Sequence, residues 1–136
     1  MKRAGVLNRR LSGALARLGH TDLVVVCDAG LPIPEGPGAP RVVDLAFRAG
    51  VPSFAEVLDG LLDELVVEGA TVAEEVEGAN PEAAARLHRL FDGVESGLVS
   101  VSHEELKALT PRAKLVVRTG ETRPYANVVL RCGVPF

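Results

Sequence analysis

Aromatic residues are scarce in this sequence, and tryptophan is absent. Four Phe and one Tyr occur among 136 residues, so Val, Leu and Ala must supply nearly all of the buried volume. Hydrophobic residues nevertheless make up 47% of the chain and charged residues 24%, which excludes the low-hydrophobicity signature of a disordered protein. We expect one domain over residues 1–136 with an aliphatic core, since this length needs no metal or disulfide staples.

Cysteine and excess positive charge are also lacking. Cys27 and Cys132 are too few for a four-thiol zinc site and too far apart for a CxxC motif, so no metal site is expected. Fifteen Lys and Arg against 18 Asp and Glu give a formal net charge of -3. The chain therefore lacks the overall positive charge that is typical of nucleic-acid-binding proteins.

Long apolar runs and nucleotide-binding motifs are missing as well. The apolar runs are much shorter than the roughly 18 residues of a membrane span, and no secretory signal or disulfide framework is visible, so the cytoplasm is the expected location. Gly36-Pro37-Gly38 does not lead from a strand into a helix, and neither a phosphate-binding loop nor a G-x-S-x-G nucleophile elbow occurs. These absences disfavour a dinucleotide or ATP, and we expect no cofactor.

Helical and strand-like segments alternate along the chain. Leucines at positions 7, 11, 15 and 18 recur at helical spacing, with Asn8 as the start cap and Gly19 as a left-handed stop. An unbroken apolar run predicts a strand at 23–27 that is covered on both faces. Further strands are predicted at 41–45, 66–72, 98–101, 114–118 and 127–131. The alternation predicts an α/β fold, a three-layer α/β/α domain with a mixed, mostly parallel sheet of about six strands.

Three further helices have recognisable starts. Ser53 begins a capping box for a helix that reaches about Leu65, Asn80 precedes a proline at the first helical position, and Ser102 begins a second capping box. The last two strands are joined by residues 119–126, which is too short for a helical crossover. That pair is therefore either antiparallel or not adjacent in the sheet.

The three histidines have different settings. His88 lies within a helix among charged residues, where a solvated helix face explains it. His20 lies between the first helix and a buried strand, where it is either a catalytic group or a ring that caps the helix end. His103 lies in the first turn of a helix, whose N-terminus disfavours the imidazolium and favours a neutral hydrogen-bonding ring.

Polar side chains also flank the predicted strands. Asp28 directly follows the strand at 23–27, so it stands at the carboxyl edge of the sheet, where ligands bind in open α/β folds; a turn cap is the alternative. Tyr125 and Asn127 are two positions apart and would point the same way in an extended segment. That arrangement suits a hydroxyl-rich ligand, although a packing Tyr and a turn Asn would look the same.

Several of these segments together resemble the D-ribose pyranase family. The matching motifs are Leu18-Gly19-His20-Thr21-Asp22, Val25-Val26-Cys27-Asp28-Ala29-Gly30-Leu31-Pro32-Ile33-Pro34, Gly50-Val51-Pro52-Ser53-Phe54, and the end from Gly120-Glu121 through Tyr125-Ala126-Asn127 to Cys132-Gly133-Val134. The resemblance extends almost end to end and keeps the motifs in order.

The resemblance implies a cytoplasmic isomerase, a mutarotase that interconverts the pyranose and furanose forms of D-ribose without a cofactor, as a ring-shaped homodecamer. Position by position, it makes His20 the general acid. The implied substrate contacts are Asp28, His103, Lys107, Tyr125, Ala126 and Asn127. Related fucose mutarotases share the Gly-His-x-Asp and Gly-Glu patterns but differ at residues 30–34 and have Tyr-Gly-Asn at the end, so the match favours ribose. The alternatives are a mutarotase for fucose or another sugar, and a non-catalytic sugar-binding partner of a transporter.

One distance is difficult to reconcile with a pocket made by a single chain. His20 and Asp28 are eight positions apart, and an extended segment of that length spans about 26 Å. Either the backbone bends sharply around Thr21 and Asp22, or the pocket combines His20 of one subunit with groups of its neighbour. We favour the second, which makes the assembled oligomer a requirement for activity.

Overall fold

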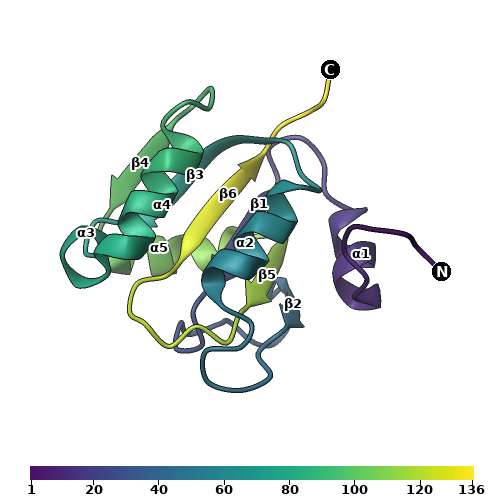
Figure 1. The fold of residues 1–136 in the computed structure, drawn as a ribbon, viewed down its shortest axis with the longest axis horizontal. Coiled ribbons are helices and arrows are strands. Elements are labelled where there is room, and N and C mark those ends of the chain that lie inside the picture. Colours follow the sequence, from purple (N-terminus) through teal and green to yellow (C-terminus); the bar gives the residue numbers. More distant parts are fainter.

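Six strands form one sheet in the order β2-β5-β1-β6-β3-β4 (Figure 1). The computed structural model describes all residues 1–136. The strands are β1 (Leu23–Cys27), β2 (Arg41–Asp44), β3 (Val67–Ala73), β4 (Leu98–Val101), β5 (Leu115–Arg118) and β6 (Val128–Cys132). The helices are α1 (Arg9–Leu15), α2 (Phe54–Leu62), α3 (Val76–Ala79), α4 (Pro81–Phe91), α5 (His103–Leu109) and the 3₁₀ turn η1 (Thr110–Arg112).

Strand β6 runs against the other five. The pairs β1·β5, β2·β5 and β3·β4 are parallel, whereas β6 is antiparallel to both of its neighbours, β1 and β3. The predicted mixed, mostly parallel sheet of about six strands is thus confirmed. Strands β5 and β6 are not adjacent, because β1 lies between them. All strands except β6 therefore end at the same edge of the sheet, which we call the carboxyl edge.

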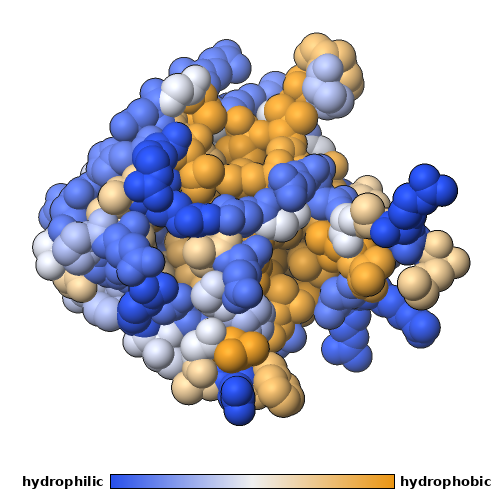
Figure 2. All heavy atoms as spheres, in the orientation of Figure 1, coloured by the Kyte–Doolittle hydropathy of each residue, from blue (hydrophilic) through white to orange (hydrophobic).

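The two faces of the sheet are covered unequally. A cluster of 23 buried residues lies between one face and helices α1, α2 and α4, and a cluster of eight lies between the other face and α5 with the loop after β1. Strand β1 serves both faces by alternation: Val24 and Val26 face the larger cluster, and Val25 and Cys27 the smaller. Figure 2 shows hydrophobic side chains between α4 and α2 and hydrophilic ones over α4. No helix of the chain is both long and apolar enough to cross a membrane.

The helix starts agree with the sequence better than the helix ends do. Asn8, Ser53, Asn80 and Ser102 each accept a hydrogen bond from a backbone N–H of the first helical turn. The predicted stop at Gly19 is wrong, because α1 ends at Leu15 and continues as turns. Helix α2 likewise ends at Leu62, three residues before the predicted position, and α3 was not predicted. Caps depend on a few local residues, whereas helix ends also depend on the packing of the next segment.

Candidate active site

A cavity of about 500 Å³ opens at the carboxyl edge of the sheet. Three segments line it. Asp28 follows β1, His103 begins α5 just after β4, and residues 121–125 belong to the connection between β5 and β6. These segments meet because the five parallel strands end at one edge and β6 begins there. The arrangement is the general one for ligand sites in open α/β sheets, and it agrees with the predicted position of Asp28.

Asp28 and Asn127 hold each other by two hydrogen bonds. The Asn127 side-chain amide donates to Asp28 Oδ2 at 3.0 Å, and its oxygen accepts from the backbone N–H of Asp28 at 2.9 Å. The backbone N–H of Gly30 donates to Asp28 Oδ1 at 2.9 Å. Each carboxylate oxygen retains a lone pair, so Asp28 can still accept from ligand hydroxyls. Asn127 is only 1% exposed, and its amide supports Asp28 without lining the cavity itself.

Tyr125 and His103 form an aromatic wall of the cavity. Their ring centroids are 5.0 Å apart and the planes meet at 87°, an edge-to-face contact. Tyr125 adopts a left-handed backbone with φ of 55°. The expectation that Tyr125 and Asn127 point the same way from an extended segment is therefore wrong. Tyr125 lines the cavity, whereas Asn127 is linked to it through its hydrogen bond to Asp28.

His103 brings an unused hydrogen-bonding atom to this wall. Its backbone N–H donates to both carboxylate oxygens of Glu75, at 3.1 and 3.0 Å, which fixes the start of α5. Its Nδ1 is buried and has no partner within the protein. Buried polar atoms are normally paired, so the orphaned Nδ1 fits the predicted role of His103 as a contact for a polar ligand.

Besides Asn127, two other predicted contact residues lie outside the lining of the cavity. Lys107 is one helical turn beyond His103, and its ammonium pairs with Glu104 at 2.5 Å. Ala126 is 1% exposed and packs in the larger hydrophobic cluster. Within one chain, then, the direct lining from the predicted set consists of Asp28, His103 and Tyr125.

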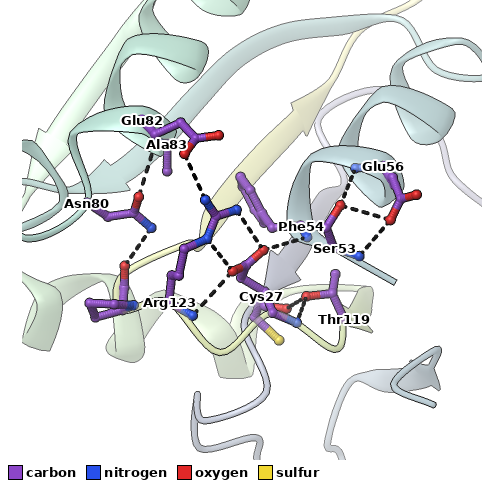
Figure 3. Close-up of polar contacts among 11 residues, drawn as sticks. Cys27, Ser53, Phe54, Glu56, Asn80, Glu82, Ala83, Thr119 and Arg123 are labelled. Atoms are coloured by element: carbon purple, nitrogen blue, oxygen red, sulfur yellow. Dashed lines mark hydrogen bonds and ion pairs between the residues drawn. The ribbon is translucent and has the colours of Figure 1, made fainter. Parts of the chain in front are cut away.

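Glu121 is a site residue that our assignment missed. Its side chain is 4% exposed, and its carboxylate accepts from the first backbone N–H of α2, at Phe54, at 3.1 Å and from Arg123 Nε at 2.7 Å. Arg123 also pairs with Glu82 of α4 at 2.9 Å (Figure 3). These partners, Arg123 first, hold the pKa of Glu121 below its usual value although burial opposes them. The Gly120-Glu121 pair within the family motif was the available signal.

The loop between β5 and β6 has a second anchor on α4. The side chain of Asn80 donates to the carbonyl of Pro124 at 3.0 Å and accepts from the backbone N–H of Ala83, as Figure 3 shows. Glu121 and Asn80 thus tie the two halves of this loop to the starts of α2 and α4. A left-handed non-glycine residue such as Tyr125 persists only where its surroundings hold it, and these anchors do so.

His20 lies at the opposite edge of the sheet. Its Nε2 is 2.9 Å from Glu68 Oε2, and its side chain is 53% exposed. The left-handed turn at Thr21, with φ of 67°, does not return it to the cavity, and it does not cap α1. The five-residue strand β1, at about 3.3 Å per residue, separates the two edges by about 16 Å. A single chain therefore does not bring His20 to Asp28.

The remaining reactive groups are inert or dispersed. Cys27 and Cys132 are free and buried, and burial raises the pKa of Cys27 to about 12 and that of Cys132 to about 11. Neither thiol is a nucleophile at neutral pH. No group of three or more His, Cys, Asp and Glu side chains is placed to hold a metal ion. Hydrogen bonding and proton transfer are the chemistry that the site offers.

The fold and the pocket define a small mixed α/β protein, and the model of the RbsD / FucU transport protein family matches residues 1–135 of the chain. The chain belongs to that family. It is 69% identical to the D-ribose pyranase of Streptomyces avermitilis and 68% identical to D-ribose pyranase 2 of Streptomyces griseus subsp. griseus, each over 136 residues that cover the whole of both chains. The resemblance seen in the sequence motifs is confirmed.

Solved structures agree with this assignment. Bacillus subtilis RbsD, solved in complex with D-ribose, is 45% identical and matches with a TM-score of 0.91 over 100% of both chains. The fucose mutarotase of Streptococcus pneumoniae, solved with L-fucose, covers 100% of both chains at a TM-score of 0.79 but is 23% identical. The second structure shares the fold, and the first is also a clear sequence relative.

Proposed function

We propose that this chain is a D-ribose pyranase, an isomerase that interconverts the pyranose and furanose forms of D-ribose. The observation that carries the proposal is the full-length identity of 68–69% to proteins named for this activity. The pocket supports it independently, because Asp28, His103 and Tyr125 offer several hydrogen-bonding groups around a cavity of about 500 Å³, which suits a small polyhydroxylated ligand.

The reaction opens and closes a sugar ring by proton transfers, without an oxidation, a reduction or the transfer of a group. A proton must reach the ring oxygen while the anomeric hydroxyl loses one, the ring C–O bond breaks, and a different hydroxyl then attacks the free aldehyde. A group that titrates near neutral pH can give and retake such a proton, and we assign this role to His20. Asp28 acts as an ionised acceptor that orients the sugar hydroxyls, and Tyr125 and His103 add further hydrogen bonds.

The proposed site spans two subunits. His20 lies at one edge of the sheet and Asp28 at the other, so His20 from a neighbouring copy must complete the pocket. Lys107 and Ala126 remain proposed contacts that the assembled interface would bring to the sugar. We propose a ring-shaped homodecamer in the cytoplasm; the two free, buried thiols suit that location.

The test of this function is the exchange between ring forms, followed by saturation-transfer NMR on D-ribose. Wild type should accelerate the exchange, and His20→Ala should lower its rate by about 10² to 10⁴, the usual contribution of general acid–base catalysis. The substitution should leave the fold intact, because the ring is half exposed, which circular dichroism checks. Faster exchange with L-fucose than with D-ribose would reassign the sugar. Binding of ribose without any faster exchange would favour a non-catalytic transporter partner.

A further inference from the structure

The three histidines differ in which ring nitrogens are already occupied. Both nitrogens of His88 are bonded: Nε2 lies 2.5 Å from Glu77 and Nδ1 lies 3.2 Å from Asp92. His20 has one bonded nitrogen, Nε2, at 2.9 Å from Glu68, and its ring is 53% exposed. The Nδ1 of His103 is buried and has no partner. Only His20 therefore combines a carboxylate on one nitrogen with an unoccupied nitrogen on an exposed ring.

The carboxylate that holds His20 is itself fixed. Glu68 lies on β3 with its side chain 14% exposed, and its second oxygen accepts from Arg131 Nε of the adjacent strand β6 at 2.8 Å. Its backbone carbonyl accepts from Ser96 at 2.7 Å. The Glu77 side chain is 51% exposed and has no such second partner. Glu68 is therefore built into the sheet edge, and Glu77 is a surface partner.

We propose that Glu68 is a positioning residue for His20, fixing the ring with Nε2–H toward the carboxylate so that Nδ1 alone carries the proton that moves. An ionised carboxylate can only accept, so the ring must donate from Nε2 whether it is neutral or charged. The imidazolium then gives its Nδ1 proton to the ring oxygen without turning. The proposal rests on the proposed function, in which His20 is the acid.

The proton balance closes within one turnover. In ring opening, Nδ1 protonates the ring oxygen as the C–O bond breaks, and the anomeric hydroxyl gives its proton to solvent water as the carbonyl forms. In reclosure, another hydroxyl attacks the carbonyl carbon and passes its proton to Nδ1, while the carbonyl oxygen takes a proton back from solvent water. The Nε2–H bond to Glu68 is the same before and after each step, so the ring needs no reorientation.

Neighbouring charges favour this arrangement. Arg131 shares the Glu68 carboxylate at 2.8 Å, so the carboxylate has a positively charged partner besides the ring. Asp22, the carboxylate two positions after His20, is already held by Lys114 at 2.7 Å and by the backbone N–H of Gly19 at 2.7 Å. Those partners lower the pKa of Asp22, so it stays an acceptor for them. Glu68 is thus the carboxylate available to His20.

The experiment compares Glu68→Ala and Glu68→Gln with Glu77→Ala, which removes the carboxylate of the exposed His88 pair. Each full-length variant is measured for ribose exchange, with kcat and KM separated, and by ¹⁵N NMR for the His20 tautomer. We expect Glu68→Ala to lower kcat by about 10- to 100-fold with little change in KM, and to mix the two tautomers. Glu68→Gln keeps the size of the side chain and one acceptor oxygen but loses the charge, so it should lower kcat by about fivefold. Glu77→Ala should match wild type.

The outcomes separate this proposal from the proposed function. Wild-type protein that does not accelerate ribose exchange contradicts the function, whatever Glu68 does. An active wild type with Glu68→Ala within twofold of its kcat overturns the role of Glu68. A lower kcat with an unchanged Nε2–H tautomer also overturns it, because Glu68 would then act only through the structure of the edge.

Discussion

The two edges of the sheet carry complementary halves of one chemistry. The carboxyl edge holds a cavity lined by Asp28, His103 and Tyr125, which suits binding. The opposite edge has His20 on an exposed ring with a fixed carboxylate beside it, which suits proton transfer. The proposed sugar contacts and the proposed acid are thus separated within the chain by the length of a strand. The difference teaches that, under the proposed function, activity requires this edge of one copy to meet the carboxyl edge of another.

The largest effect is expected when this division is tested by mixing. His20→Ala and Asp28→Asn should each be nearly inactive in ribose exchange. When the two are unfolded, mixed in equal amounts and reassembled, about a quarter of the sites should combine an intact His20 from one chain with an intact Asp28 from another. The recovered NMR exchange rate should then approach that fraction of the wild-type rate.

The control for mixing is a chain that carries both substitutions. Reassembled with wild type, the double variant should dilute activity, and reassembled with either single variant it should restore none. If two inactive single variants recover no activity although size-exclusion chromatography shows full assembly, the sites lie within single chains and the division of labour between edges is wrong.

An intermediate effect is expected from the anchor of the pocket loop. Glu121→Gln should lower the free energy of unfolding in urea by about 1–3 kcal/mol, because it removes a buried charged acceptor from Phe54 and Arg123. Glu82→Gln is the matched control: it removes the exposed partner of the same Arg123 and should change the stability by less than about 1 kcal/mol. Equal losses in the two variants would contradict the anchoring role.

The same residue predicts a pH dependence. The folded-state pKa of Glu121 is held below its usual value near 4.5. Its contribution is therefore full above that value and is lost as the pH falls through the folded-state pKa. Urea unfolding between pH 3 and 7 should show a shallower acid loss for Glu121→Gln than for wild type.

The smallest effect is expected at His88, away from both edges. Glu77, and to a lesser extent Asp92, raises the pKa of His88 above 6.5. The pair therefore stabilises the fold below about pH 6.5 and loses that effect as the pH rises through the raised pKa. In urea unfolding, Glu77→Gln should lower stability by less than about 1 kcal/mol at pH 6 and by nothing at pH 9. A loss that persists at pH 9 would show that the charge of His88 is not the cause.

Sequence reasoning succeeded where the signal was local. Strands β1 and β4 and the caps at Ser53 and Ser102 lie where the apolar runs and capping boxes predicted them. The carboxyl-edge position of Asp28 followed from the strand before it. Such features depend on a few neighbouring residues, so they can be predicted without the fold.

Contacts between distant positions could not be predicted in this way. Asp28 and Asn127 were both expected in the site, but their mutual hydrogen bonds join positions 99 apart. His20 and Glu68 are 48 positions apart and meet because β6 brings β1 and β3 into one sheet. The left-handed backbone of Tyr125 was also missed, because only the loop anchors explain why a residue other than glycine adopts it.

The reversal of β6 determines how the last part of the chain reaches the cavity. If β6 were parallel to the other strands, it would begin at the opposite edge of the sheet. The chain would then need a long crossover connection from the end of β5 back to that edge. Because β6 instead starts where β5 stops, residues 119–127 stay beside the mouth of the cavity and need no intervening helix. Because one strand is inverted, a connection of nine residues supplies one side of the cavity.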